Sequence, residues 1–278
     1  MLTLAALDTW KLLENPFGNS EDIPALIEKL DNSFSAEILN EICWDYIYHQ
    51  NSLYEATFAT IPYLVSICEK ADDPYNKMST FINIGIILSE MDANDELLLQ
   101  IFSDSIVDRE TVNAIISSYK SALKQLPAIG QSLFNMVPEL DEDDKRHFLV
   151  ALATVHERYD VAKVFCTYSG NDEYMCTCPH CDTEFYIWNK ENELVLYTQD
   201  PVFKKNQPDF PITPRPLSIA QSFENISIGP NYEWLVFYIN HLGIYSLQPV
   251  IGYLFGETQC PECKTSFDIF DAVSRPLV

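Results

Sequence analysis

Two short stretches, Cys178-Pro179-His180-Cys181 and Cys260-Pro261-Glu262-Cys263, constrain the fold of this chain more than any other feature. Each places two thiols one tight turn apart, and proline pre-sets the φ angle of such a turn. An alternating segment typical of a β-strand follows each turn, at 183–187 and at 265–269. Four thiolates on two such turns complete a tetrahedral site. We therefore predict one structural Zn²⁺, with the ligands Cys178, Cys181, Cys260 and Cys263.

Four further cysteines bring the total to eight. Cys43, Cys68 and Cys166 stand in apolar runs and are expected in the core. Cys176 could replace a metal ligand or lie beside the metal, and His180 could also replace a cysteine. Paired Cys-x-x-Cys segments, in a chain whose first residues show no secretion signal, favour metal binding in a reducing compartment over disulfides. The expected location is cytoplasmic.

The chain is strongly acidic, because 17 Lys and Arg stand against 41 Asp and Glu, which gives a formal net charge of −24. Such a field repels nucleic acid and anionic membranes, so we expect neither as a partner. It attracts a basic protein and speeds the encounter. The alternative interpretation is that the charge only keeps the protein soluble.

Residues 1–170 are expected to form one helix after another, with few glycines between them. Ser52 and Glu55 match a capping box, which predicts the start of a helix at this point. The apolar positions that follow lie on one helical face and predict a buried stripe of Thr57, Ile61, Leu64, Val65 and Cys68. Expected helices are 23–30, 36–49, 52–71, 75–90, 96–102, 110–126, 130–136 and one that runs from the acidic segment 139–144 to Tyr159.

Residues 41–68 carry a motif that resembles bacterial HEAT-like repeat proteins. Its parts are Trp44-Asp45, His49-Gln50, Tyr54-x-Ala56-Thr57-x-Ala59 and Ile61-Pro62-x-Leu64-Val65. That family usually has glycine after His-Gln, whereas this chain has Asn51, which tolerates left-handed dihedral angles. The resemblance implies an α-solenoid over residues 1–170. Some relatives accompany polymorphic toxins and look like immunity proteins, so it also implies a toxin as the partner.

Residues 171–278 are expected to form a second, smaller domain of the α+β class. A hairpin is predicted from 185–189 and 194–198, then an irregular proline-rich connection over 201–216 and helices at 232–242 and 247–255. This helical insertion separates the two cysteine pairs of a zinc-ribbon-like module. The expected fold class is mainly α, with a HEAT-like α-solenoid at 1–170 and the zinc-binding domain at 171–278.

Acidic turns stand at the ends of several expected helices. If the helices form a solenoid, these turns line one of its edges, where a basic toxin domain could dock. The alternative interpretation is that they are ordinary solvated helix ends. The candidate partner-binding residues are Asp72, Asp73, Asp92, Asp95, Glu96, Asp141, Glu142, Asp143 and Asp144.

The sequence contains no phosphate loop and no Gly-x-Gly-x-x-Gly, His-Glu-x-x-His or Gly-x-Ser-x-Gly motif. His156-Glu157 begins a zincin-like segment, but Asp160 occupies the position of its second histidine. The first hypothesis is therefore a protein-binding module, an immunity protein that neutralises a toxin and carries a structural zinc. The alternatives are a zinc-dependent enzyme, a general scaffold or adaptor, and a nucleic-acid-handling zinc ribbon, against which the charge argues.

Overall fold

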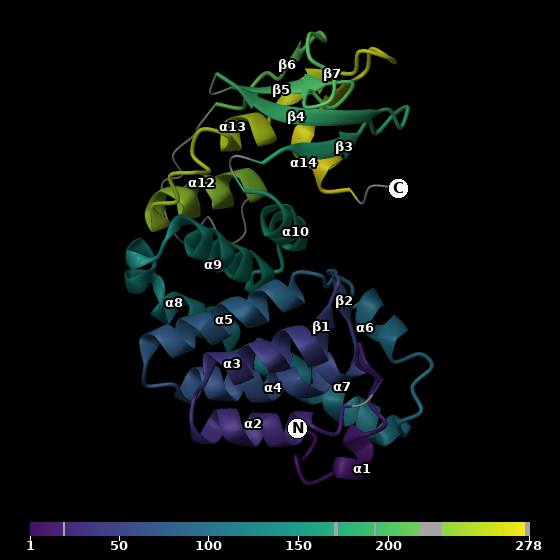
Figure 1. Ribbon diagram of the computed structural model, residues 1–278, viewed down its shortest axis with the longest axis vertical. Helices are drawn as coiled ribbons and strands as arrows, with labels where there is room; N and C mark the ends of the chain where they lie inside the picture. Colours follow the sequence, from purple (N-terminus) through teal and green to yellow (C-terminus); the bar gives the residue numbers. More distant parts are fainter. Residues whose placement is uncertain (19, 170–171, 192, 217–229, 276–278) are drawn as a thin grey trace. The chain divides into compact units, whose positions relative to one another are not determined.

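The computed structural model describes residues 1–18, 20–169, 172–191, 193–216 and 230–275, and most of its regular structure is helical (Figure 1). The expectation of a mainly α protein is confirmed. Contacts divide the chain into two compact units, Met1–Val137 with Val150–Ala162, and Pro138–Leu149 with Lys163–Val278. The expected domain boundary at residue 170 comes from a change of composition along the chain. The two units are defined by contacts in space instead, so the boundary stays a prediction.

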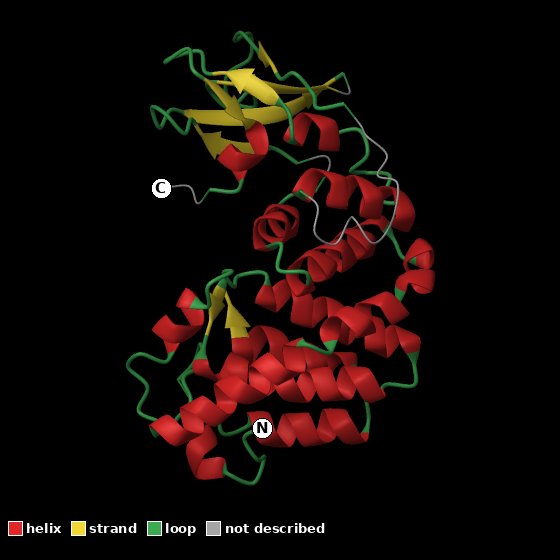
Figure 2. Cartoon of the chain, turned by 180° about the vertical axis from the view of Figure 1, so that it is seen from behind, coloured by secondary structure: helices red, strands yellow, loops and turns green. Residues whose placement is uncertain are grey.

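The first unit consists of helices and one short hairpin (Figure 2). It begins with α1 (Leu7–Trp10), α2 (Ile23–Asn32), α3 (Ala36–Asn40), the π-helix η1 (Glu41–Ile47), and strands β1 (Tyr48–His49) and β2 (Ser52–Leu53). It continues with α4 (Glu55–Lys70), α5 (Pro74–Leu88), α6 (Glu96–Ile101), α7 (Arg109–Leu123) and α8 (Leu126–Ser132). The 3₁₀ helix η2 (Phe134–Glu139) and helices α9 (Glu142–Val155) and α10 (Tyr159–Thr167) run across the borders between the two units.

Helix α4 is the centre of packing in the first unit, with contacts to α2, α5, α7 and α8. All members of the predicted stripe are buried, so this prediction is confirmed. Phe58 and Thr60, which lie outside the stripe, are also fully buried. A helix that is covered on nearly every side needs neighbours all round, and the surrounding helices supply them.

The predicted start of α4 is wrong. The helix begins at Glu55, and the N-cap is Tyr54, whose amide donates to Thr57 Oγ1 at 2.9 Å. Ser52 lies in β2, where it pairs with His49. The Glu55 carboxylate is 3% exposed and accepts a hydrogen bond from the amide of Glu14 at 2.9 Å. Ser52 therefore lies in a strand and the Glu55 side chain binds a distant amide, so the two do not form the predicted capping box.

Between β1 and β2, Gln50 and Asn51 form a two-residue turn in which both φ angles are positive, 47° and 58°. This geometry is that of a type I′ hairpin turn, which favours asparagine and glycine. Asn51 therefore adopts the left-handed conformation that asparagine tolerates. The Tyr48 hydroxyl lies 3.0 Å from Asn51 Oδ1 and fixes the corner.

Several expected helices are shorter than the sequence indicates. The helix expected to reach Tyr159 ends at Val155, and Tyr159 begins the separate helix α10. The segment 36–49 is divided among α3, η1 and β1, and the segment 130–136 among α8 and η2. The segment 247–255 keeps helical structure only in α13 (Ile251–Leu254), because Pro249 disfavours the helical region for the residue before it. Among the described residues, we find no helix with both the length and the apolar character needed to cross a bilayer.

The second unit contains the larger sheets (Figure 2). An antiparallel sheet has the order β3 (Tyr174–Thr177), β4 (Glu184–Lys190), β5 (Glu193–Tyr197) and β6 (Phe210–Pro211). A second antiparallel pair consists of β7 (Glu257–Gln259) and β8 (Ser266–Asp268). Helices α12 (Asn231–Leu242), α13 and α14 (Ile269–Val273) also belong to the unit. The predicted hairpin is confirmed as β4 and β5. The sequence did not predict β3 and β7, which precede the two cysteine pairs.

Gly85 on α5 gives a test of packing in the first unit. A Cβ at this position would lie 2.2 Å from Ala151 Cβ and 2.3 Å from Ala151 Cα. Helix propensity alone favours Gly85→Ala by about 1 kcal/mol, and forced overpacking costs about 1–3 kcal/mol or more. We expect Gly85→Ala to lower the free energy of unfolding by about 2 kcal/mol in a urea titration.

The control for this substitution is Ser79→Ala on the same helix, at a half-exposed position. Its effect should stay within about 0.5 kcal/mol. A Gly85→Ala protein as stable as the unchanged protein would contradict the close approach of Gly85 and Ala151.

Candidate metal centre

Each cysteine pair forms the turn of an antiparallel hairpin. Residues 178–181 lie in the turn between β3 and β4, and residues 260–263 lie in the turn between β7 and β8. The strand before each pair fixes the first cysteine, and the strand after it starts just beyond the second. The two turns are therefore held by the same kind of local pairing, although they are far apart in the sequence.

The backbone hydrogen bonds of the two turns are equivalent. The Cys178 amide donates to Thr183 O at 2.8 Å, and the Cys260 amide donates to Thr265 O at 3.0 Å. The residue after the second cysteine returns a bond of 3.0 Å to the first cysteine's carbonyl in both cases. That residue has a positive φ in each turn, 56° at Asp182 and 63° at Lys264. Both turns thus bring their two thiols to the same side.

A pair of stacked rings joins the two hairpins. Phe185 and Phe267 each stand four residues after the second cysteine of their turn, and their side chains are buried. The ring centroids are 6.1 Å apart, with 11° between the ring planes. This apolar contact holds one hairpin against the other and places the two turns next to each other.

The four predicted sulfur atoms come together in the structure. The Sγ atoms of Cys178 and Cys263 are 3.8 Å apart, and those of Cys181 and Cys260 are 3.7 Å apart. All four lie within 4.8 Å of one another. These separations are far longer than the roughly 2.0 Å of a disulfide bond. The four cysteines could therefore hold one metal ion.

The four sulfurs differ in exposure and in the groups around them. Cys178 and Cys260 are buried, and burial raises the pKa of the Cys178 thiol to about 12. Cys181 and Cys263 are exposed, and a hydrogen bond from Thr265 lowers the pKa of Cys263 to about 6. Thr183 stands in the same position beside Cys181, with its hydroxyl 3.2 Å from the sulfur. A bound cation acts in the same direction as these threonines, because it stabilises thiolates.

Neither Cys176 nor His180 belongs to this group of four among the described residues. Cys176 is buried on β3 opposite Phe185 in the strand register, and burial raises the pKa of its thiol to about 12. His180 is exposed within the first turn. The sequence analysis missed the two threonines as supporting groups, although their identical position, two residues after the second cysteine, was a usable signal.

Comparisons of the chain with protein-family models, with curated proteins and with solved structures find no match. The description of the site therefore depends on the chain's own residues and their geometry.

The acidic candidate residues fall into three kinds of environment. Some accept backbone amides at the start of helices. Asp73 Oδ1 accepts from Tyr75 at 2.8 Å and Asp92 Oδ2 from Leu97 at 2.8 Å. Asp141 accepts from Asp144 at 2.8 Å. These carboxylates satisfy amide donors that a helix leaves without partners, so they have a structural role besides their charge.

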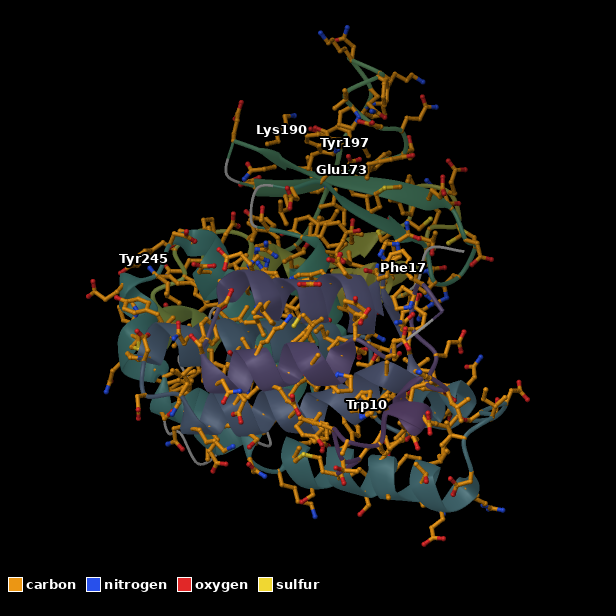
Figure 3. The ribbon with its side chains drawn as sticks, turned by 60° about the horizontal axis from the view of Figure 1, so that its bottom comes forward. Trp10, Phe17, Glu173, Lys190, Tyr197 and Tyr245 are labelled. Carbon is orange, nitrogen blue, oxygen red and sulfur yellow. The ribbon has the colours of Figure 1, made fainter. Side chains whose placement is uncertain are left out.

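Other acidic candidates lie in ion pairs. Asp95 is 2.6 Å from Lys120 Nζ, and Asp143 is 3.5 Å from Arg146. Glu142 is 3.3 Å from Lys145 and accepts from the Ser246 amide at 3.0 Å, beside the exposed Tyr245 (Figure 3). The remaining candidates are exposed, and they are Asp72, Glu96 and Asp144. Asp72 to Glu96 belong to the first unit and Asp141 to Asp144 to the second.

The adjacent residues Asp72 and Asp73 allow the contribution of helix capping to be measured apart from that of surface charge. Asp73→Ala removes the cap of α5 and should lower the free energy of unfolding by about 1 kcal/mol. Asp72→Ala removes the same charge without a helix cap and should change it by less than about 0.5 kcal/mol. Urea titrations of both variants check the difference, and equal losses would contradict the capping role.

Proposed function

We propose that the four cysteines hold one structural Zn²⁺. In a tetrahedral site with Zn–S bonds of about 2.3 Å, neighbouring sulfurs are about 3.8 Å apart. The observed separations of 3.8 Å and 3.7 Å match that edge length. Four protein thiolates leave no position for water, which favours a structural over a catalytic role.

The metal would stabilise the second unit by closing a long loop. Residues 182–259 lie between the two turns, and they include β4, β5, β6 and α12. An ion bound only by the folded chain adds its binding free energy to the free energy of unfolding. A tetrahedral set of four sulfurs also suits iron, so metal analysis is part of the test.

Cys181→Ser tests the metal site with little change in packing, because Cys181 is exposed. We expect the purified protein to hold about one equivalent of zinc by mass spectrometry, and the variant to lose it together with several degrees of melting temperature. Cys176→Ala is the matched control, and it should keep the metal. Equal metal content in the Cys181→Ser variant would contradict the site.

We further propose that the chain is a protein-binding module, and that its partner is a basic protein. The single observation that carries this proposal is the net charge of −24, which disfavours nucleic acid and anionic membranes as partners. Asp73 and Asp141 remain exposed although they accept amides at helix starts. They can therefore contribute to the attraction of a basic partner as well as to stability.

The resemblance of residues 41–68 to HEAT-like repeat proteins narrows this proposal to toxin neutralisation. The hairpin corner at Asn51 has the left-handed backbone that the family's glycine would adopt, which supports the resemblance. On this proposal residues 1–170 are an α-solenoid, and the chain binds a basic toxin domain and covers its active site.

Gene neighbourhood and binding together test the partner. We expect a reading frame for a basic toxin domain beside the gene, and its purified product should form a stoichiometric complex with the chain and lose its activity. The association rate should fall by about tenfold or more as ionic strength rises, because salt screens charge steering. A product that the chain neither binds nor inhibits would overturn toxin neutralisation.

A further inference from the structure

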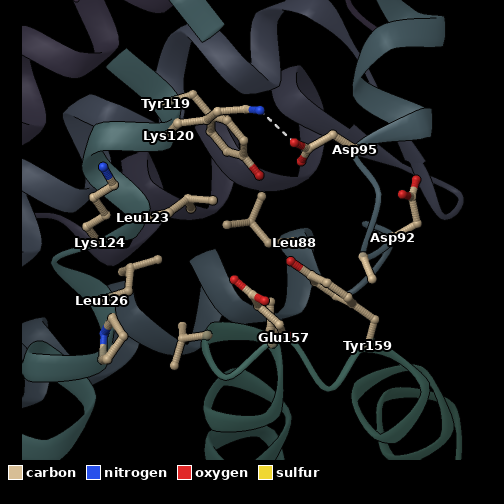
Figure 4. Close-up of a pocket in the computed structure, with 14 residues that line it drawn as sticks. Leu88, Asp92, Asp95, Tyr119, Lys120, Leu123, Lys124, Leu126, Glu157 and Tyr159 are labelled. Carbon is tan, nitrogen blue, oxygen red and sulfur yellow. Dashed lines mark hydrogen bonds and ion pairs between the residues drawn. The ribbon is translucent and has the colours of Figure 1, made fainter. Parts of the chain in front are cut away.

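A cavity of about 340 Å³ lies wholly within the first unit (Figure 4). This volume is at the lower end of the range for small-ligand sites, about 300–1,000 Å³. Its apolar lining includes Leu88 from α5, Leu123 from α7 and Leu126 from α8. Its polar lining comes from α7, from the turn before α6 and from the segment that joins α9 to α10, so segments distant in sequence build it.

The side chain of Tyr119 brings a hydroxyl group to the cavity wall. Its side chain is only 1% exposed, and its hydroxyl points into the cavity (Figure 4). Among the described residues, no hydrogen bond to this hydroxyl is formed, although its ring packs against Phe58. The Tyr119 hydroxyl is therefore available to a molecule that enters the cavity.

Two further oxygen-bearing side chains, Glu157 and Tyr159, point into the same space (Figure 4). Glu157 makes no ion pair with any other described residue, whereas Asp95 is neutralised by Lys120 at 2.6 Å. Asp92 is occupied by the amides at the start of α6. Glu157, an exposed residue, therefore brings to the cavity a carboxylate that has no ion-pair partner among the described residues.

The charged groups around the oxygens of Tyr119, Glu157 and Tyr159 leave room for a cation between them. The remaining cation of the lining, Lys124, lies at the edge of the cavity, away from Tyr119, Glu157 and Tyr159 (Figure 4). Burial and the neighbouring Glu157 raise the pKa of Tyr159 to about 12, so its phenol is neutral at pH 7. A neutral hydroxyl can both accept and donate hydrogen bonds.

Glu157 also occupies a backbone position at which glycine is the usual residue. Its φ angle is 58°, and the Arg158 amide donates to Ala153 O at 2.8 Å, which is the pattern of a helix C-terminus closed by a left-handed residue. A glutamate is less favourable than glycine in this conformation. The chain thus places a carboxylate at the cavity against the local backbone preference.

We propose that this cavity binds an organic cation, a protonated amine or a guanidinium on a short apolar stem. The Glu157 carboxylate neutralises the cation, and the Tyr119 and Tyr159 oxygens accept its N–H groups. The leucine side chains pack against the stem. The site does not depend on the proposed zinc or on toxin neutralisation, since a free small molecule and a lysine or arginine side chain of a partner present the same group.

Four probes with one butyl stem test the chemistry: butylguanidine, butylamine, butanol and butyrate. We expect the two cations to bind the full chain about tenfold or more tightly than the neutral and anionic probes, as measured by NMR titration. Glu157→Gln should weaken cation binding by about tenfold, and Tyr119→Phe by about fivefold. Glu28→Gln, which changes an exposed glutamate of α2 outside the cavity lining, should leave binding unchanged.

Equal or tighter binding of butanol or butyrate, no binding of either cation, or unchanged affinity in Glu157→Gln would each overturn the proposal. Thermal unfolding shows whether each variant folds. If Tyr119→Phe does not fold, Glu157→Gly carries the test, because glycine suits that backbone and removes the carboxylate. Its loss of cation binding with an unchanged or higher melting temperature supports the proposal, and retained binding overturns it.

An acetylated and amidated Gly-Arg-Gly peptide distinguishes the two sources of the cation. If the peptide competes with butylguanidine at equal or lower concentration, the cavity takes a side chain from a polypeptide. If butylguanidine binds and the peptide does not, the cavity takes a free small cation. Both results support the site, and they leave the toxin proposal to its own binding experiment.

Discussion

The sulfur atoms of four cysteines lie within 4.8 Å of one another, although residues 182–259 separate the first two cysteines from the last two. The chain meets this constraint with two hairpins whose turns share the same hydrogen bonds and the same left-handed residue, at Asp182 and Lys264. The stacked rings of Phe185 and Phe267 then hold the hairpins together. Each turn can form from the pairing of its own two strands. The contact between the two hairpins then fixes both ends of the segment 182–259. The proposed metal would add its binding free energy to this arrangement.

Acidic side chains serve this protein in two ways that do not exclude each other. Asp73, Asp92 and Asp141 accept amides at helix starts, where a negative charge also favours the helix dipole. Their charge still contributes to the field of a chain with net charge −24. Some of the acidic residues are thus explained by their role as acceptors for the backbone amides at helix starts, which have no partner within the helix. The proposed attraction of a basic partner uses the same charges without requiring a dedicated patch.

The interior of the first unit combines close packing with an open space. Gly85 and Ala151 approach so closely that no Cβ fits, while Thr154 nearby donates to Gly85 O at 3.0 Å and also lines the cavity. Buried polar groups and cavities of this kind are absent from an ideal core, where side chains fill the space. In the proposed complex, the Tyr119 hydroxyl and the Glu157 carboxylate both bind the same organic cation.

The sequence by itself determined the features that depend on neighbours along the chain. Helical periodicity located the buried stripe of α4, and the repeated cysteine spacing singled out the four cysteines whose sulfurs lie together. Both depend on residues a few positions apart in the chain. Only the tertiary structure decided the use of Glu55, because its carboxylate accepts from the amide of Glu14, which is distant in the sequence. The same holds for the cavity. Tyr119 and Glu157 lie far apart in sequence, so no local pattern could show that their oxygens face one space.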